Sequence, residues 1–93
     1  MYEQFRSILN ANKPNRITYF SIDSESDYYN QETEITVTIQ YSYCSTYDDW
    51  SDYSYAIAQA RRLIYRAWDQ TFGRYPSSYT LKEIKEENVY DGD

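Results

Sequence analysis

The sequence contains no histidine, a single cysteine, Cys44, and only two glycines, Gly73 and Gly92. Without histidine, no serine or cysteine has an imidazole base to activate it as a nucleophile. Two isolated glycines cannot form a glycine-rich phosphate-binding loop. The many carboxylates lack the apolar neighbours that tune one of a pair for acid–base catalysis. We therefore expect a protein with no enzymatic activity, no cofactor and no bound metal.

The chain also has no long apolar run and no excess of positive charge. No segment approaches the roughly 20 apolar residues of a membrane span, and the N-terminus lacks the apolar core of a signal peptide. Nine basic and 15 acidic residues give a formal net charge of −6, which argues against direct binding to nucleic acid. The lone cysteine cannot form an internal disulfide. We expect a soluble cytoplasmic protein that is not exported by a signal peptide.

Leucine is scarce, whereas tyrosine is abundant. The 93 residues include three leucines and 13 tyrosines. A chain of this length forms one domain, which we place at residues 1–93. Tyrosine combines a large apolar ring with a hydroxyl that needs a partner, and it is enriched at protein interfaces. The tyrosines therefore indicate a core with polar edges, an interaction surface, or both.

The clearest structural pattern is strict alternation from Thr33 to Tyr43, which predicts a half-buried strand. The segment Arg16–Asp23 is rich in β-branched and aromatic residues and predicts a first strand, antiparallel to it. Between the two, Ser24–Glu32 is polar and predicts a broad, acidic hairpin tip. The residues expected on the buried face of the second strand are Ile35, Val37, Ile39, Tyr41 and Tyr43.

Two helices are predicted, at Tyr2–Asn12 and at about Asp52–Thr71. An acidic connector, Ser45–Asp52, leads to the second helix, for which Thr46 or Ser51 is the expected N-cap. The stripe expected to be buried on this helix is Tyr53, Ala56, Ile57, Ala60, Leu63, Ile64, Ala67 and Trp68.

Gly73 is the expected end of the long helix, with Pro76 beyond it. The tail from Ser77 to Asp93 fits a third strand by alternation, although Thr80 and Glu83 also fit the capping box of a short helix. We favour the strand because two strands alone make an unstable sheet. The expected fold is therefore α+β: a small antiparallel sheet in α-β-β-α-β order, with one long amphipathic helix across one face.

Acidic residues with interleaved tyrosines form the first candidate site. On one interpretation, these acids belong to an ordinary solvated loop. A calcium site of the EF-hand type is not expected, because the spacing of the acids lacks that pattern. On another, they imitate the phosphates of DNA and occupy the groove of a DNA-binding protein. Tyr47 and Asp52 lie in the same connector as the last two acids of the set. The candidate residues are Asp23, Glu25, Asp27, Tyr28, Tyr29, Glu32, Glu34, Asp48 and Asp49.

Arginines on the long helix form the second candidate site, with Arg62 and Arg66 as neighbours one turn apart and Arg61 and Arg74 nearby. They form an ordinary solvent face, paired with Asp69, on the simpler interpretation. On the other, the arginines of one copy meet the acidic hairpin of the next. Such head-to-tail association closes into a ring.

The order of elements, with RITYFSIDSESDYYNQETEITVTIQYSY and the helix YAIAQARRLIYRAW, resembles the tail-terminator and head–tail joining (neck) proteins of long-tailed phages and prophages. The late segment EENVYDGD is similar to the acidic turn before that family's last strand. The family pattern continues with a closing strand, which this sequence does not supply. A neighbouring copy is then expected to complete the sheet.

The resemblance implies a non-enzymatic virion component that forms rings, caps a tail tube and contacts neighbouring virion proteins. It would assemble in the host cytoplasm and then remain in the virion. The resemblance carries over no catalytic residues. The alternative is a small acidic phage-encoded inhibitor of a host defence nuclease, similar to the acidic anti-CRISPR proteins, whose partner would be a nucleic-acid-binding effector complex.

Overall fold

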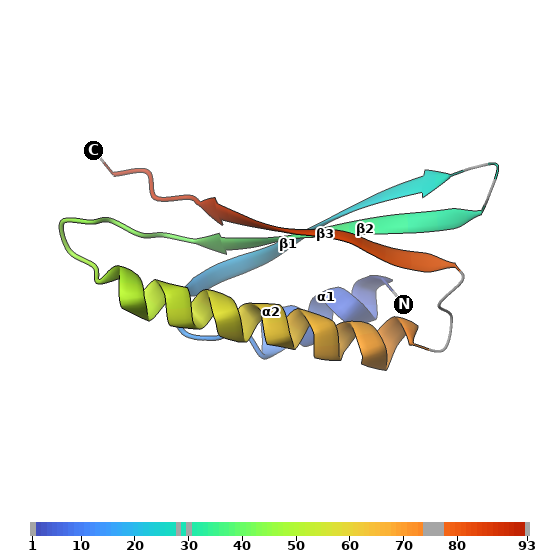
Figure 1. The fold of residues 1–93 in the computed structure, drawn as a ribbon, viewed down its shortest axis with the longest axis horizontal. Coiled ribbons are helices and arrows are strands. Elements are labelled where there is room, and N and C mark those ends of the chain that lie inside the picture. Colours follow the sequence, from blue (N-terminus) through green and yellow to red (C-terminus); the bar gives the residue numbers. More distant parts are fainter. Residues whose placement is uncertain (1, 28, 30, 74–77, 93) are drawn as a thin grey trace.

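The described residues form two helices and three strands in α-β-β-α-β order (Figure 1). The computed structural model describes residues 2–27, 29, 31–73 and 78–92. The elements are α1 (Tyr2–Ala11), β1 (Ile17–Asp27), β2 (Glu32–Tyr41), α2 (Trp50–Phe72) and β3 (Tyr79–Asn88). The order and the α+β class are confirmed, and so is the strand predicted after Ser77.

The sheet has the order β1-β2-β3 and is mixed. β1 pairs antiparallel with β2, as expected, whereas β3 pairs with β2 in parallel, from Thr33 opposite Tyr79 to Tyr41 opposite Asn88. The expectation of a purely antiparallel sheet is therefore corrected. The cause is α2, which runs back along the sheet and returns the chain to the end where β2 begins, as a parallel pair requires.

Alternation along β2 places its apolar residues under the helices. Ile35, Val37 and Ile39 are fully buried, and Tyr41 is nearly so. Tyr43 lies beyond the end of the strand and is half-buried, in edge contact with the ring of Trp50. The central position of β2 explains why the strongest strand signal of the sequence lies here.

Both helices cover the same face of the sheet (Figure 1). Every residue of the predicted α2 stripe is buried except Trp68, which is half-buried, and Thr71 and Phe72 extend the stripe. From α1, Phe5 and Leu9 complete the core. The Phe5 ring lies 5.6 Å from the Trp68 ring at 89° and 5.4 Å from the Phe72 ring. Edge-to-face geometry of this kind is favourable for aromatic pairs.

The N-cap of α2 is Asp49, one residue before Trp50, and neither Thr46 nor Ser51 has this role. The Asp49 carboxylate accepts a hydrogen bond from the Ser51 N–H at 3.0 Å. At the other end, Gly73 is the C-cap, as expected, and its N–H donates to the Asp69 carbonyl. Several polar residues precede the helix in the sequence. The cap is identified only in the structure, where the Asp49 carboxylate accepts from the N–H of the second helical residue, Ser51.

The hairpin between β1 and β2 is longer and narrower than expected. Ser24–Asp27 belongs to β1, and its residues pair with β2 from Ile35 back to Glu32. All of them are exposed. The predicted broad tip at Ser24–Glu32 is therefore wrong. Polar residues can continue a strand beyond the core, because the backbone hydrogen bonds of the sheet do not depend on apolar side chains.

Candidate interaction surfaces

The sheet face opposite the helices carries a high density of carboxylates. Residues that alternate with the buried ones point to this face, and we call it the open sheet face. Seven carboxylates lie there, against the ammonium groups of Lys82 and Lys85. The seven are Asp23, Glu25, Asp27, Glu32, Glu34, Glu83 and Glu87.

Lys82 neutralises part of this charge. A register shift in β3 makes Lys82 the extra residue of a bulge. Its Nζ lies 3.2 Å from the carboxylate of Glu25 and 3.6 Å from that of Glu34, which are direct partners in the β1–β2 ladder. The hydrogen bond with Glu25, followed by the charges of Glu25 and Glu34, raises the pKa of Lys82. The lysine thus offsets repulsion between two like charges that face each other.

The predicted acidic residues separate into two groups. Asp23, Glu25, Asp27, Glu32 and Glu34 share the open sheet face. Asp48 and Asp49 lie instead in the connector before α2. There the Asp48 carboxylate accepts from the Cys44 N–H at 2.9 Å, and Asp49 caps the helix.

Of the tyrosines in the predicted site, Tyr29 is 92% exposed, Tyr47 is 83% exposed, and Tyr28 lies outside the described residues. No group of three possible metal ligands occurs among the residues that the structure describes. The described helices also include none long and apolar enough to cross a bilayer.

The predicted arginines also separate. Arg62 and Arg66 are exposed on the side of α2 away from the sheet, with Tyr55 and Tyr65, and we call these four residues the arginine face. Within the described part of the chain, neither arginine forms an ion pair, so the expected pairing with Asp69 is not observed.

Arg61 does not contribute to the arginine face. Arg61 reaches the other way, and its guanidinium donates to the Glu86 carboxylate of β3 at 2.6 Å. This ion pair joins α2 to the outer strand of the sheet. Arg74 lies outside the described residues.

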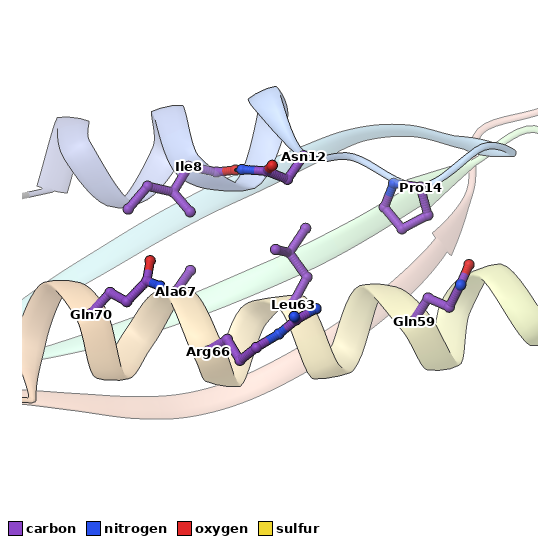
Figure 2. A pocket seen from close by; sticks show the side chains of 8 residues that line it. All are labelled: Ile8, Asn12, Pro14, Gln59, Leu63, Arg66, Ala67 and Gln70. Carbon is purple, nitrogen blue, oxygen red and sulfur yellow. The ribbon is translucent and has the colours of Figure 1, made fainter.

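A groove of about 420 Å³ lies between α1 and α2 (Figure 2). Ile8 of α1 and Leu63 and Ala67 of α2 form its apolar floor. Polar groups surround this floor, and among them Arg66 supplies the positive charge. The groove could not be predicted from the sequence, because the packing of α1 against α2 is not visible in the residue pattern of either helix alone. The lining residues are Ile8, Asn12, Pro14, Gln59, Leu63, Arg66, Ala67 and Gln70.

The charges are distributed unevenly over the two layers. Of the eight basic residues that the structure describes, six lie in α1, in the loop after it or in α2. Half of the 14 described carboxylates lie on the open sheet face. The open sheet face is therefore strongly acidic, whereas most of the described basic residues lie in the helical layer.

The one thiol of the chain, that of Cys44, is half-buried after β2. A hydrogen bond from the Tyr90 hydroxyl, with a smaller contribution from the Thr46 backbone, lowers the pKa of Cys44. The same hydrogen bond raises the pKa of Tyr90. This contact joins the segment after β3 to the segment after β2.

Comparison of the chain with family models, with curated proteins and with solved structures gives no match. The features of the molecule that bear on its function are the open sheet face, the arginine face and the groove.

Proposed function

We propose that this protein is a non-enzymatic virion component of a phage or prophage, of the tail-terminator or neck type, that acts through protein–protein contacts in a ring of identical copies. The observation that carries this proposal is the uneven distribution of charge between its two faces. The open sheet face holds seven carboxylates, and the far side of α2 holds Arg62 and Arg66.

Excess carboxylates on one face and exposed arginines on the other favour one mode of self-association. A two-fold symmetric contact would place carboxylates against carboxylates, or arginines against arginines, whereas a head-to-tail contact pairs unlike charges. Tyrosine and arginine, which compose the arginine face, are also the residues most enriched among the energetically important positions of interfaces. Repetition of one head-to-tail contact closes into a ring when its rotation divides a full turn.

The outer strand β3 favours a contact through faces over one through its own edge, unlike the expectation that a neighbouring copy completes the sheet. β3 has a bulge at Lys82 and a second lysine at Lys85, and charged residues and bulges at an edge disfavour pairing with another sheet. The resemblance to neck proteins adds the expectation that neighbouring virion proteins contact the ring. On this proposal the copies assemble in the host cytoplasm and remain in the virion.

Light scattering coupled to size-exclusion chromatography tests the ring. We expect oligomers at about 10 mM salt and their dissociation near 1 M, because the Debye length falls from about 30 Å to about 3 Å. Arg62→Glu should abolish the oligomer. Lys85→Glu is the matched control, since it changes the net charge equally but adds to the open sheet face, and it should preserve the oligomer. A wild-type monomer at all salt and protein concentrations would contradict the proposal.

A second candidate function is inhibition of a host defence nuclease by imitation of DNA. The observation that favours it is the spacing of Asp23, Glu25 and Asp27, which occupy every second position on the open face of one strand. At about 3.4 Å per residue, neighbouring carboxylates lie about 7 Å apart, with Glu32 and Glu34 on the strand about 4.8 Å away. Such a row suits a basic groove that normally receives a phosphate backbone.

Competition with duplex DNA for a purified nucleic-acid-binding effector complex distinguishes the two functions. For an inhibitor, Asp23→Asn combined with Asp27→Asn should weaken the competition, and Arg62→Glu should leave it unchanged. For a ring component, the protein should not compete at all. Neighbouring genes for capsid and tail proteins would favour the virion function, whereas a neighbouring helix-turn-helix regulator would favour the inhibitor.

A further inference from the structure

The distal part of the β1–β2 hairpin is an arm without a core of its own. We define the hairpin arm as residues 24–27, 29 and 31–34. Its two strands reach past the end of α2 (Figure 1). The residues that continue the buried face here are Ser24, Ser26 and Thr33, which are small and polar. Ladder pairing, and not burial, therefore holds this arm in place.

The turn of the arm combines an aromatic ring with carboxylates. Tyr29 is 92% exposed, and its N–H donates to the Asp27 carboxylate at 3.0 Å. The Gln31 N–H donates to the Asp27 carbonyl at 2.8 Å, and Gln31 adopts a positive φ of 56°. These hydrogen bonds define the turn, and Glu32 adds a second carboxylate where β2 begins.

The groove between α1 and α2 has the complementary chemistry. Its floor of Ile8, Leu63 and Ala67 offers an aromatic ring an apolar surface to cover (Figure 2). The Arg66 guanidinium at the rim is a donor suited to a carboxylate. The amide side chains of Asn12, Gln59 and Gln70 are further polar groups in the lining.

We propose that the hairpin arm of one copy inserts into the groove between α1 and α2 of the next copy. Tyr29 then covers the apolar floor, and the carboxylate of Asp27 or Glu32 pairs with Arg66. This inference rests on the proposed function and names the contact that forms the ring. Opposite charges favour this pairing of arm and groove. All charged residues of the arm are acidic, and the charged residue among those that line the groove is Arg66.

Complementation of two defective variants tests the contact. Tyr29→Ala damages the arm and Arg66→Glu damages the groove, so each should weaken self-association at least about tenfold, as loss of an energetically important interface residue does. Tyr47→Ala removes another highly exposed tyrosine and should assemble as the wild type does. A mixture of the two defective variants should form a one-to-one dimer, because one intact arm meets one intact groove.

The outcomes separate this inference from the proposed function. If the wild type assembles and Tyr29→Ala assembles equally well, the arm is not the contact, although the ring remains. If the wild type is a monomer under all conditions, both proposals fail.

Disulfide trapping gives a second readout. With Cys44→Ser as background, Tyr29→Cys and Gln70→Cys in one chain should give covalent oligomers on oxidation, whereas Tyr47→Cys with Gln70→Cys should not. Equal trapping of the two pairs would overturn the inference.

Discussion

Lys82 on one outer strand of the sheet forms an ion pair with Glu25 on the other outer strand, at 3.2 Å, across the central strand. The lysine side chain passes Glu34 on the way, at 3.6 Å. A three-stranded surface with seven carboxylates thus places one ammonium group against Glu25 and Glu34, which face each other directly. This arrangement reduces the repulsion between these two charges, whereas Asp27 and Glu32 form a second directly opposed pair towards the hairpin turn.

The Lys82 ammonium should titrate at a raised pKa. Its contribution to stability is present below the unfolded value of about 10.4 and is lost as the pH rises through the higher folded value. Nuclear magnetic resonance of the Lys82 Nζ group measures this titration. In Glu25→Gln, which removes the hydrogen-bonding carboxylate, the pKa of Lys82 should fall. An identical titration in the two proteins would show that the ion pair does not form in solution.

Phe5 should be a major determinant of stability, because it is fully buried and its ring contacts both Trp68 and Phe72. Phe5→Ala should reduce the free energy of unfolding by about 3–5 kcal/mol. Tyr55→Ala, at a site 65% exposed, should change it by less than about 0.5 kcal/mol. Urea unfolding followed by circular dichroism measures both. Similar losses in the two variants would mean that α1 does not pack on α2 as described.

The cap of α2 should make stability depend on pH in the acid range. Hydrogen bonds from the Ser51 backbone and then from its hydroxyl lower the pKa of Asp49. The Asp49 carboxylate therefore stabilises the protein above the unfolded value of about 3.9, and this contribution is lost as the pH falls through the lower folded value.

Substitution of Asp49 tests this cap. Asp49→Ala should lower the urea midpoint at neutral pH, with a difference from the wild type that shrinks in acid. Asp49→Ser keeps an oxygen acceptor for the Ser51 N–H and should retain stability without this pH dependence. A constant difference between wild type and Asp49→Ala across the acid range would contradict the assignment.

The Cys44 thiol should react faster than an ordinary cysteine of equal exposure, because the Tyr90 hydroxyl stabilises its thiolate. Tyr90→Phe removes this donor, so the pKa of Cys44 should rise and alkylation by iodoacetamide at neutral pH should slow. The pH dependence of the alkylation rate measures the change. Tyr47→Phe is the control, since only the Tyr47 backbone contributes at Cys44. Equal rate profiles in the two variants would exclude the contact.

Much of the fold could be predicted from the sequence because buried faces require apolar residues at a regular spacing along strands and helices. The alternation around Val37 and the helical stripe around Leu63 both report which side faces the core, and the structure confirms both. The direction of β3 relative to β2 produces no such pattern of apolar residues. Its apolar residues, Leu81 and Ile84, would face the helices whether the strand ran parallel or antiparallel. The course of α2 decides that question.

The surfaces were only partly visible in the sequence. The acids of β1 and β2 were identified as a group, but their interpretation as a loop was wrong, because Ser24 and Ser26 pair in the ladder without burial. Glu83 and Glu87 join the same face only through the register of β3. Side chains far apart in the sequence become neighbours through pairing, and composition cannot report this.

The parallel pairing of β2 with β3 is also expected to form later in folding than the β1–β2 hairpin. The β1–β2 hairpin joins residues close in sequence, whereas β3 pairs with β2 only when the long segment that contains α2 closes into a loop. Contacts between distant segments form slowly because a long loop must close first. Until then the edge of β2 that receives β3 has no partner. A newly made chain is thus most exposed to mispairing at its own central strand, and the pairing of β3 ends that exposure.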